Sequence, residues 1–271
     1  MTLLSRAVLS SLLLSSFTVH AATNYEIRLP SGSGSQAAEA QQGSSLSTAG
    51  PTFSTLSVGK SHSHYILGNI IKAYGDGTYG HAGNSPSGSW LTVESASQHV
   101  IALQADGTVW GAGSNVYGQL GNTLPYSSPN GWANLGFTGA VDVAATEDTS
   151  YVLKSDGTVW GSGKGSLGEF GNNDVTTQIA FFDLGLTDVI AIESLFGVRG
   201  AHALKSDGTL WVTGISSFGQ LGVPGTAVWV QSATDVAKIF PGAYVSMLIK
   251  TDGTTWVSGY GVDGALGTGN T

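Results

Sequence analysis

The chain contains no cysteine, and charged residues make up only 10% of its sequence. Without cysteine it can form no disulfide, no thiol nucleophile and no lipoprotein anchor. After residue 23 no segment keeps the apolar periodicity of a helix, so a helical fold is not expected. Basic residues are scarce as well, with 10 against 18 acidic ones, and they form no cluster. Direct nucleic-acid binding is therefore not expected, because phosphate contacts need grouped lysines and arginines.

Long hydrophobic runs are also missing, apart from a short one near the N-terminus. Arg6 precedes the apolar stretch Ala7–Phe17, and small residues follow at Val19 and Ala21. This pattern predicts a secretory signal peptide over residues 1–22. The alternative, a membrane anchor, would need a run of about 20 apolar residues. We therefore expect an exported bacterial protein, secreted or periplasmic, with no membrane span once the signal is removed.

Glycine, in contrast, is abundant, with 40 residues, and much of it lies in a repeated phrase. The first clear copy reads DGTVWGAGSNVYGQLG, and a degenerate copy ends at Gly83. The clear copies are Asp106–Gly121, Asp156–Gly171, Asp207–Gly222 and Asp252–Gly267. Counted from Gly83 of the degenerate copy, the five closing glycines follow one another at spacings of 38, 50, 51 and 45 residues. Periods in this range indicate one supersecondary unit stacked several times.

Each unit is composed of short strands. Two apolar strand patterns precede every Asp-Gly pair, a tryptophan-bearing strand follows it, and the middle repeats add a fourth strand. Asp-Gly between apolar runs predicts a hairpin with a two-residue turn in which both residues have positive φ. Four antiparallel strands in roughly fifty residues are typical of a propeller blade. The predicted fold is an all-β propeller, or partial propeller, of about five four-stranded blades over residues 54–271, after a short strand and a Ser/Gly/Ala-rich linker over residues 23–53.

The repeated phrase resembles the signature of the regulator of chromosome condensation repeat family. Asn115, Tyr117, Gly118, Gln119 and Leu120 match that signature almost letter for letter. The family builds β-propellers, usually of seven blades, so the resemblance implies a propeller here. The chain has only five units, which leaves a five-blade ring, an open arc and a fragment of a longer protein as alternatives. Chromatin binding and guanine-nucleotide exchange, known from eukaryotic members, are not expected of an acidic exported chain.

The loops between the first and second strands differ sharply among the repeats, and functional contacts on a repeated scaffold concentrate in such loops. In the family, loops on one propeller face bind the partner. The resemblance therefore implies these partner-binding residues: His62, Gln98, Asp148, Phe196, Arg199 and Tyr244. Tyr117 and Phe218, in the glycine-rich loops, are expected on the opposite face. The predicted function is non-enzymatic binding of a protein of unknown identity, with a carbohydrate-binding lectin-like or adhesin module as the alternative.

Other motifs have structural explanations. Three Gly-x-Gly-x-x-Gly strings share one phase of the repeat and precede no helix, so they are not expected to bind a dinucleotide. The aspartate of each Asp-Gly pair is expected to cap its own turn. Packing between blades is expected of His64, His99, His202 and of Trp110, Trp160, Trp211 and Trp256. No catalytic residue, metal site or cofactor is predicted.

Overall fold

The computed structural model describes residues 25–26, 41–42, 55–75, 77–80, 85–122, 131–194, 199–262 and 265–267. The chain divides into two compact units, Met1–Pro51 and Thr52–Thr271. In the first unit β1 (Tyr25–Glu26) pairs with β2 (Gln41–Gln42) in antiparallel fashion. The predicted signal peptide lies outside the described residues.

The second unit consists of five antiparallel sheets, and its described residues form no α-helix. Sheet 1 contains β3 (Leu56–Val58), β4 (His62–Leu67) and β5 (Ile70–Gly75). Sheet 2 contains β6 (Trp90–Ser95), β7 (His99–Gln104), β8 (Val109–Gly113) and β9 (Ala133–Asn134). Sheet 3 contains β10 (Ala140–Ala145), β11 (Thr149–Lys154), β12 (Val159–Gly163) and β13 (Gln178–Asp183). Sheet 4 contains β14 (Val189–Ser194), β15 (Gly200–Lys205), β16 (Leu210–Gly214) and β17 (Thr226–Ala233). Sheet 5 contains β18 (Val236–Pro241), β19 (Val245–Lys250) and β20 (Thr255–Gly259).

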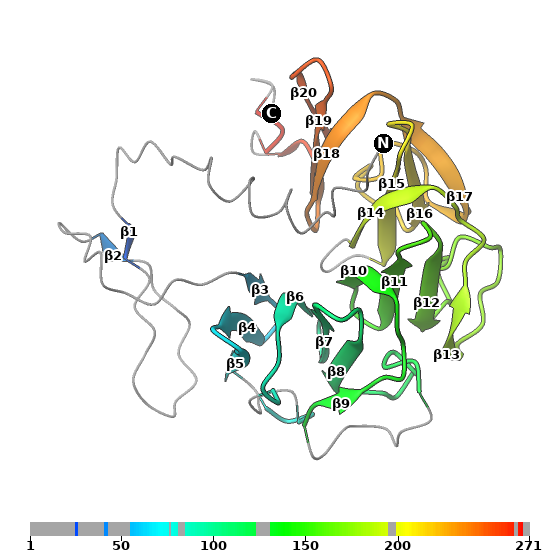
Figure 1. The fold of residues 1–271 in the computed structure, drawn as a ribbon. Coiled ribbons are helices and arrows are strands. Elements are labelled where there is room, and N and C mark those ends of the chain that lie inside the picture. The colour runs from blue at the N-terminus through cyan, green and yellow to red at the C-terminus, as the bar shows by residue number, and fades with distance from the viewer. Residues whose placement is uncertain are drawn as a thin grey trace, which may run out of the picture. The chain divides into compact units, whose positions relative to one another are not determined.

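The sheets follow one another in an arc, with sheets 1 and 5 at its two ends (Figure 1). The first strand of each sheet packs against the preceding sheet: β6 contacts sheet 1, β10 contacts sheet 2, β14 contacts sheet 3 and β18 contacts sheet 4. The predicted propeller architecture is thus confirmed. Sheets 2, 3 and 4 have the expected four strands, whereas sheets 1 and 5 have three within the described part of the chain.

The hydrophobic core lies in the seams between neighbouring sheets. In the seam between sheets 2 and 3, Leu103 and Val109 from one sheet pack with Val143 and Val152 from the other, and all four are almost fully buried. Because the second strands of sheets 2, 3 and 4 are covered on both sides, their residues are buried without alternation, as in β7 and β11.

The histidines and tryptophans that were predicted to pack between blades differ in how deeply they are buried. His64, His99 and His202 are buried between sheets, with exposed fractions of 2% or less. Trp110, Trp160 and Trp211 pack against the seam clusters but are half-buried. The prediction was wrong for Trp256, which is 56% exposed on β20 because no described fourth strand of sheet 5 covers it.

The hairpin turns hold glycine at positive φ, as predicted, but they are not two-residue turns. Gly107, Gly157 and Gly208 have φ of 81°, 83° and 82°, whereas the aspartates before them are not in this region. Gly157 N donates to Lys154 O at 3.0 Å, and Lys154 N donates to Thr158 O at 2.9 Å. This is a three-residue loop, a β-turn followed by a left-handed glycine.

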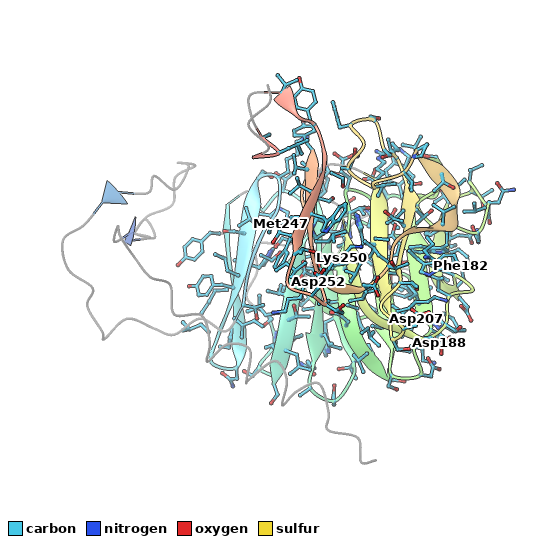
Figure 2. All side chains as sticks on the ribbon, turned by 90° about the horizontal axis from the view of Figure 1, so that it is seen from above. Phe182, Asp188, Asp207, Met247, Lys250 and Asp252 are labelled. Carbon is cyan, nitrogen blue, oxygen red and sulfur yellow. The ribbon has the colours of Figure 1, made fainter. Side chains whose placement is uncertain are left out.

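The aspartates cap these turns as expected. Asp156 Oδ1 accepts hydrogen bonds from Thr158 N at 3.0 Å and Thr158 Oγ1 at 2.6 Å, and these bonds lower the pKa of its carboxyl. The same bonds recur at Asp207 and Asp252. Figure 2 shows Asp188 and Asp207 close together at this end of sheet 4, where Ser206 N donates to Asp188 O at 2.8 Å.

Candidate functional site

Two sets of loops meet at the end of the sheets opposite the Asp-Gly turns. One set joins the first and second strands, and the other is the glycine-rich loop after the third strand. With three antiparallel strands, the chain leaves the third strand at the end where it turned from the first into the second. In each of sheets 2 to 5, one backbone hydrogen bond of 2.8–2.9 Å connects the two loops, and its donor lies in the glycine-rich loop. The four bonds are Ser114 N to Gln98 O, Lys164 N to Asp148 O, Ile215 N to Arg199 O and Tyr260 N to Tyr244 O. We call this end the loop face.

Four of the predicted contact residues occupy one equivalent position on the loop face. Gln98, Asp148, Arg199 and Tyr244 each supply the carbonyl of the hydrogen bond just described. His62 does not share the position, since it begins β4, and its side chain is only 4% exposed. A partner on this face would not reach that side chain. Phe196 lies outside the described residues.

Asp148 and Arg199 belong to a charged cluster at sheets 3 and 4. Arg199 Nη2 donates to Asp148 Oδ2 at 2.8 Å, and Arg199 Nε donates to Glu147 Oε2 at 3.3 Å. Lys164 Nζ lies 3.9 Å from Asp148 Oδ2 and 4.7 Å from the centre of the Tyr117 ring. Burial, together with the charge of Glu147, raises the pKa of Asp148 more than the charges of Arg199 and Lys164 lower it. Arg199 is thus engaged within the protein, which limits its availability to a partner.

Tyr244 belongs to a second group, which we call the aromatic cluster: Phe218, Tyr244 and Tyr260. The ring of Phe218 stands edge-on to Tyr244 and Tyr260, with centroids at 4.9 and 5.4 Å. The two tyrosines are 6.5 Å apart. Despite these contacts the three side chains remain 39%, 55% and 43% exposed, respectively. The cluster is therefore an exposed apolar surface whose rings support one another.

The backbone of the aromatic cluster is fixed at both loops. Tyr260 N donates to Tyr244 O at 2.8 Å, and Phe218 N donates to the side-chain Oε1 of Gln220 at 3.0 Å. Gln220 is itself buried. A surface held in this way loses little conformational freedom when it binds.

The structure corrects the predicted position of Phe218, which was expected on the opposite face but contacts Tyr244. Sequence reasoning also missed Tyr260. Both follow from strand count, because an odd number of strands returns the glycine-rich loop to the loop face. The same correction applies to Tyr117, which was also expected on the opposite face, because it has the same phase in the repeat as Phe218 and its ring contacts Lys164 of the loop face.

A shallow depression of about 400 Å³ lies on the loop face, lined in part by the residues that directly precede Phe218 in its glycine-rich loop. It lies between the glycine-rich loops of sheets 3 and 4, and its lining includes Leu167, Ile215, Ser216, Ser217 and Thr226. No charged side chain lines it. Together with the aromatic cluster it gives this part of the face an apolar and hydroxyl-bearing character.

Three carboxylates on the first strands were not singled out by the sequence. Burial, and after it the charges of Glu193 on β14 and Asp142 on β10, raises the pKa of Glu94 on β6 to about 8. Within the described ranges, no group of three His, Asp or Glu side chains is arranged to hold a metal ion. No helix in the same ranges is long and apolar enough to cross a membrane.

Comparison with solved structures identifies the architecture. No protein-family model and no curated protein matches the sequence. Human WBSCR16 superposes with a TM-score of 0.68 at 20% identity, over 79% of this chain and 63% of that one. Yeast RCC1 (Prp20), crystallised with Kap60, gives 0.70 at 18% identity, over 82% and 59%. A second structure, of Prp20p from Saccharomyces cerevisiae, gives a TM-score of 0.69 at 17% identity, over 81% of this chain and 60% of that one.

The fold is that of an RCC1-type propeller. The resemblance inferred from the repeats is thus confirmed at the level of fold. The chain spans about 60% of the length of these solved structures.

Proposed function

We propose that this protein is an exported, non-enzymatic propeller scaffold that binds another protein through its loop face. The observation that carries the proposal is the aromatic cluster. Phe218, Tyr244 and Tyr260 present preorganised rings, each more than a third exposed. Exposed aromatic side chains of this kind are enriched at interface hot spots.

The comparison with solved structures supports a binding role in general terms. One of the yeast structures is described together with the binding of Prp20p to Gsp1p and histones, and the other shows RCC1 with Kap60. These partners belong to the yeast protein. What the comparison supports for this chain is a propeller acting as a protein-binding scaffold.

A lectin-like or adhesin role is the second candidate function. The depression favours it, because Ser216, Ser217 and Thr226 line it and the exposed ring of Phe218 follows Ser217 directly in the chain. Apolar rings with nearby hydrogen-bonding groups suit a sugar, which has both apolar faces and hydroxyls.

The test compares three variants of the purified protein on immobilised secreted proteins of the source and on a glycan array. For a protein partner, Tyr244→Ala and Phe218→Ala should each weaken binding by about 2 kcal/mol or more, which is roughly 30-fold in Kd. Trp256→Ala is the matched control, since Trp256 is as exposed but lies on β20 outside the aromatic cluster. All three variants should unfold close to the wild-type midpoint.

Two results would count against the proposal. Unchanged affinity in both cluster variants would show that the partner binds elsewhere. Saturable binding to glycans that depends on Phe218, with no captured protein, would favour the lectin-like role instead.

A further inference from the structure

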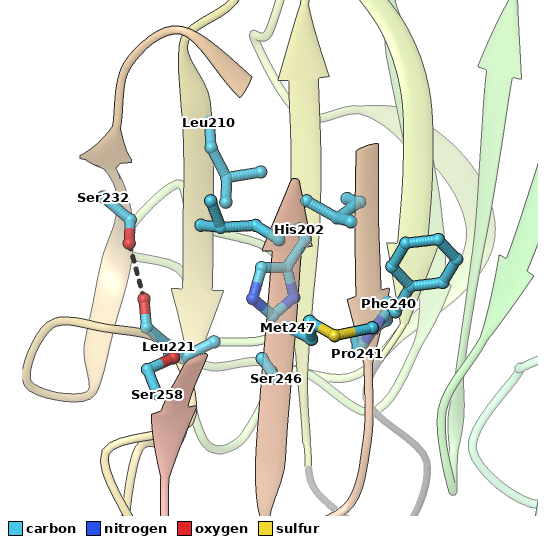
Figure 3. Close-up of a pocket in the computed structure, with 11 residues that line it drawn as sticks. His202, Leu210, Leu221, Ser232, Phe240, Pro241, Ser246, Met247 and Ser258 are labelled. Atoms are coloured by element: carbon cyan, nitrogen blue, oxygen red, sulfur yellow. Dashed lines mark hydrogen bonds between the residues drawn. The ribbon is translucent and has the colours of Figure 1, made fainter. Parts of the chain in front are cut away.

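The seam between sheets 4 and 5 contains a small, partly open cavity of about 20 Å³. Figure 3 shows His202 of β15 and Ser246 of β19 at this cavity, with Met247 beside them. Most of the remaining lining is apolar and includes Leu210, Leu221, Ile239 and Leu248. His202 is 2% exposed and Ser246 is 8% exposed. Two polar side chains from opposite sheets are thus buried in one apolar seam.

These two side chains differ from their counterparts in other seams. His99 Nε2 lies 3.0 Å from Ser150 Oγ across the seam of sheets 2 and 3. His64 Nδ1 lies 2.9 Å from Ser95 Oγ across the seam of sheets 1 and 2. Ser246 occupies the same strand position as Ser150. Yet neither His202 Nδ1 nor Ser246 Oγ has a hydrogen-bond partner among the described residues.

A proton on His202 would therefore be poorly accommodated in the closed seam. His202 is the only titratable side chain among the residues that line the cavity. The lysines of the adjacent strands lie elsewhere: Lys205 and Lys250 lie over Trp211 and Trp256, and Lys238 is exposed on β18. Burial lowers the pKa of His202 to about 4. Glu193 of β14 pairs with His202 in the sheet, but it is exposed, and burial alone accounts for the lowered pKa of His202, so no carboxylate offsets the charge of an imidazolium.

The same seam supports the aromatic cluster. Phe218 comes from sheet 4, whereas Tyr244 and Tyr260 come from sheet 5, so the cluster spans the seam. Ser246 lies on β19, two residues after Tyr244, which directly precedes this strand. On β20, Ser258 precedes Tyr260 by two residues and donates its Oγ hydrogen to Gln220 O at 3.2 Å. Separation of the two sheets would pull the three rings apart.

We propose that this seam is a proton-operated switch, in which protonation of His202 releases sheet 5 from sheet 4 and dismantles the aromatic cluster. The regulatory meaning of the switch rests on the proposed function, but the opening itself does not. A histidine in an opened seam regains an ordinary pKa near 6.5. The ratio of open to closed seam then rises as pH falls from about 6.5 to about 4, by up to roughly 300-fold for this difference in pKa.

Hydrogen–deuterium exchange of the full chain without any partner tests the opening. After correction for the intrinsic pH dependence of exchange, protection of amides in β18–β20 should fall between pH 7 and pH 4 by at least about tenfold, within the roughly 300-fold limit. Amides in β10–β12 of sheet 3 serve as the internal control, and their protection should not fall over the same pH range. An equal response of the two sheets would overturn the proposal, because it would indicate general acid destabilisation.

His202→Met provides the matched variant, since Met247 stands at the equivalent position of sheet 5. The variant should keep β18–β20 protected at pH 4. If methionine is not accommodated, His202→Gln removes the same titration with a polar side chain. Wild-type pH dependence in a folded variant would refute the switch. Because no partner is present, this result is independent of whether the loop face binds a protein.

Discussion

Glu169 shows how one residue departs from a repeated pattern. The glycine-rich loops of sheets 2 and 4 contain Gln119 and Gln220 at the same phase. Gln220 Oε1 accepts from Phe218 N, and its Nε2 donates to Ile215 O at 3.2 Å. Glu169 Oε2 likewise accepts from Leu167 N at 2.7 Å, but its Oε1 is buried without a partner among the described residues. Glu169 thus reproduces the acceptor half of the role of Gln220, as does Gln119, whose Nε2 is also buried without a partner among the described residues, and burial raises the pKa of Glu169.

We predict that Glu169→Gln stabilises the protein. An unsatisfied buried polar atom costs about 1–3 kcal/mol, and the amide supplies the missing donor. A carboxyl with a raised folded-state pKa stabilises the fold fully below its unfolded pKa and less as pH rises through the folded value. The advantage of the variant should therefore be larger at pH 8 than at pH 5, as measured by urea denaturation.

Gln220→Glu is the reciprocal control for this effect. It should lower the free energy of unfolding, with a greater loss at pH 8, because it places a carboxylate in the position that now holds an amide. If Glu169→Gln instead destabilises the protein at both pH values, the carboxylate has a partner that the described contacts do not include.

At the scale of the element, the hairpins were predictable in position but not in turn type. Asp-Gly between apolar runs located the turns before the third strands of sheets 2 to 5, whereas the turn between β4 and β5 lies at Gly68 and was not located in this way. Only glycine readily adopts the positive φ found at Gly157. The sequence did not reveal that the residue before the aspartate joins the loop. Turn type depends on strand register, which is fixed by the pairing of Leu153 with Val159.

Gly157→Val should be clearly destabilising. Gly157 has a φ of 83°, and a Cβ there would lie 3.1 Å from Asp188 N. A β-branched residue in this conformation costs roughly 1–3 kcal/mol in strain alone. Gly157→Asn is the control, because asparagine tolerates left-handed backbone better and should lose less. Thermal unfolding of both variants measures the difference, and equal midpoints for valine and wild type would contradict the turn geometry.

At the scale of the whole molecule, the repeat determined the architecture and part of the loop face. The repeat predicted equivalent loop positions for Gln98, Asp148, Arg199 and Tyr244. In the structure these four residues supply the carbonyl of the same loop hydrogen bond in successive sheets. Contacts between sheets could not be read from one unit. The ion pair of Arg199 with Asp148 joins residues 51 positions apart, and the contact of Phe218 with Tyr244 joins two sheets. Such neighbours depend on how successive sheets stack, which periodicity alone does not specify.

Export is the remaining property of the whole molecule, and we propose it on the sequence alone. Arg6 and the apolar residues Ala7–Phe17 have the order of charge and hydrophobicity that a secretory pathway recognises. Residues 1–22 contain none of the 18 acidic residues and one of the 10 basic ones, so their removal changes the formal net charge from −8 to −9. Mass spectrometry of protein from the source should find an N-terminus at Ala22 or Thr23, outside the cytosol. Cytosolic protein that retains Met1 would contradict export, while leaving the loop face and the seam of sheets 4 and 5 unaffected, because both are built from residues after Thr52.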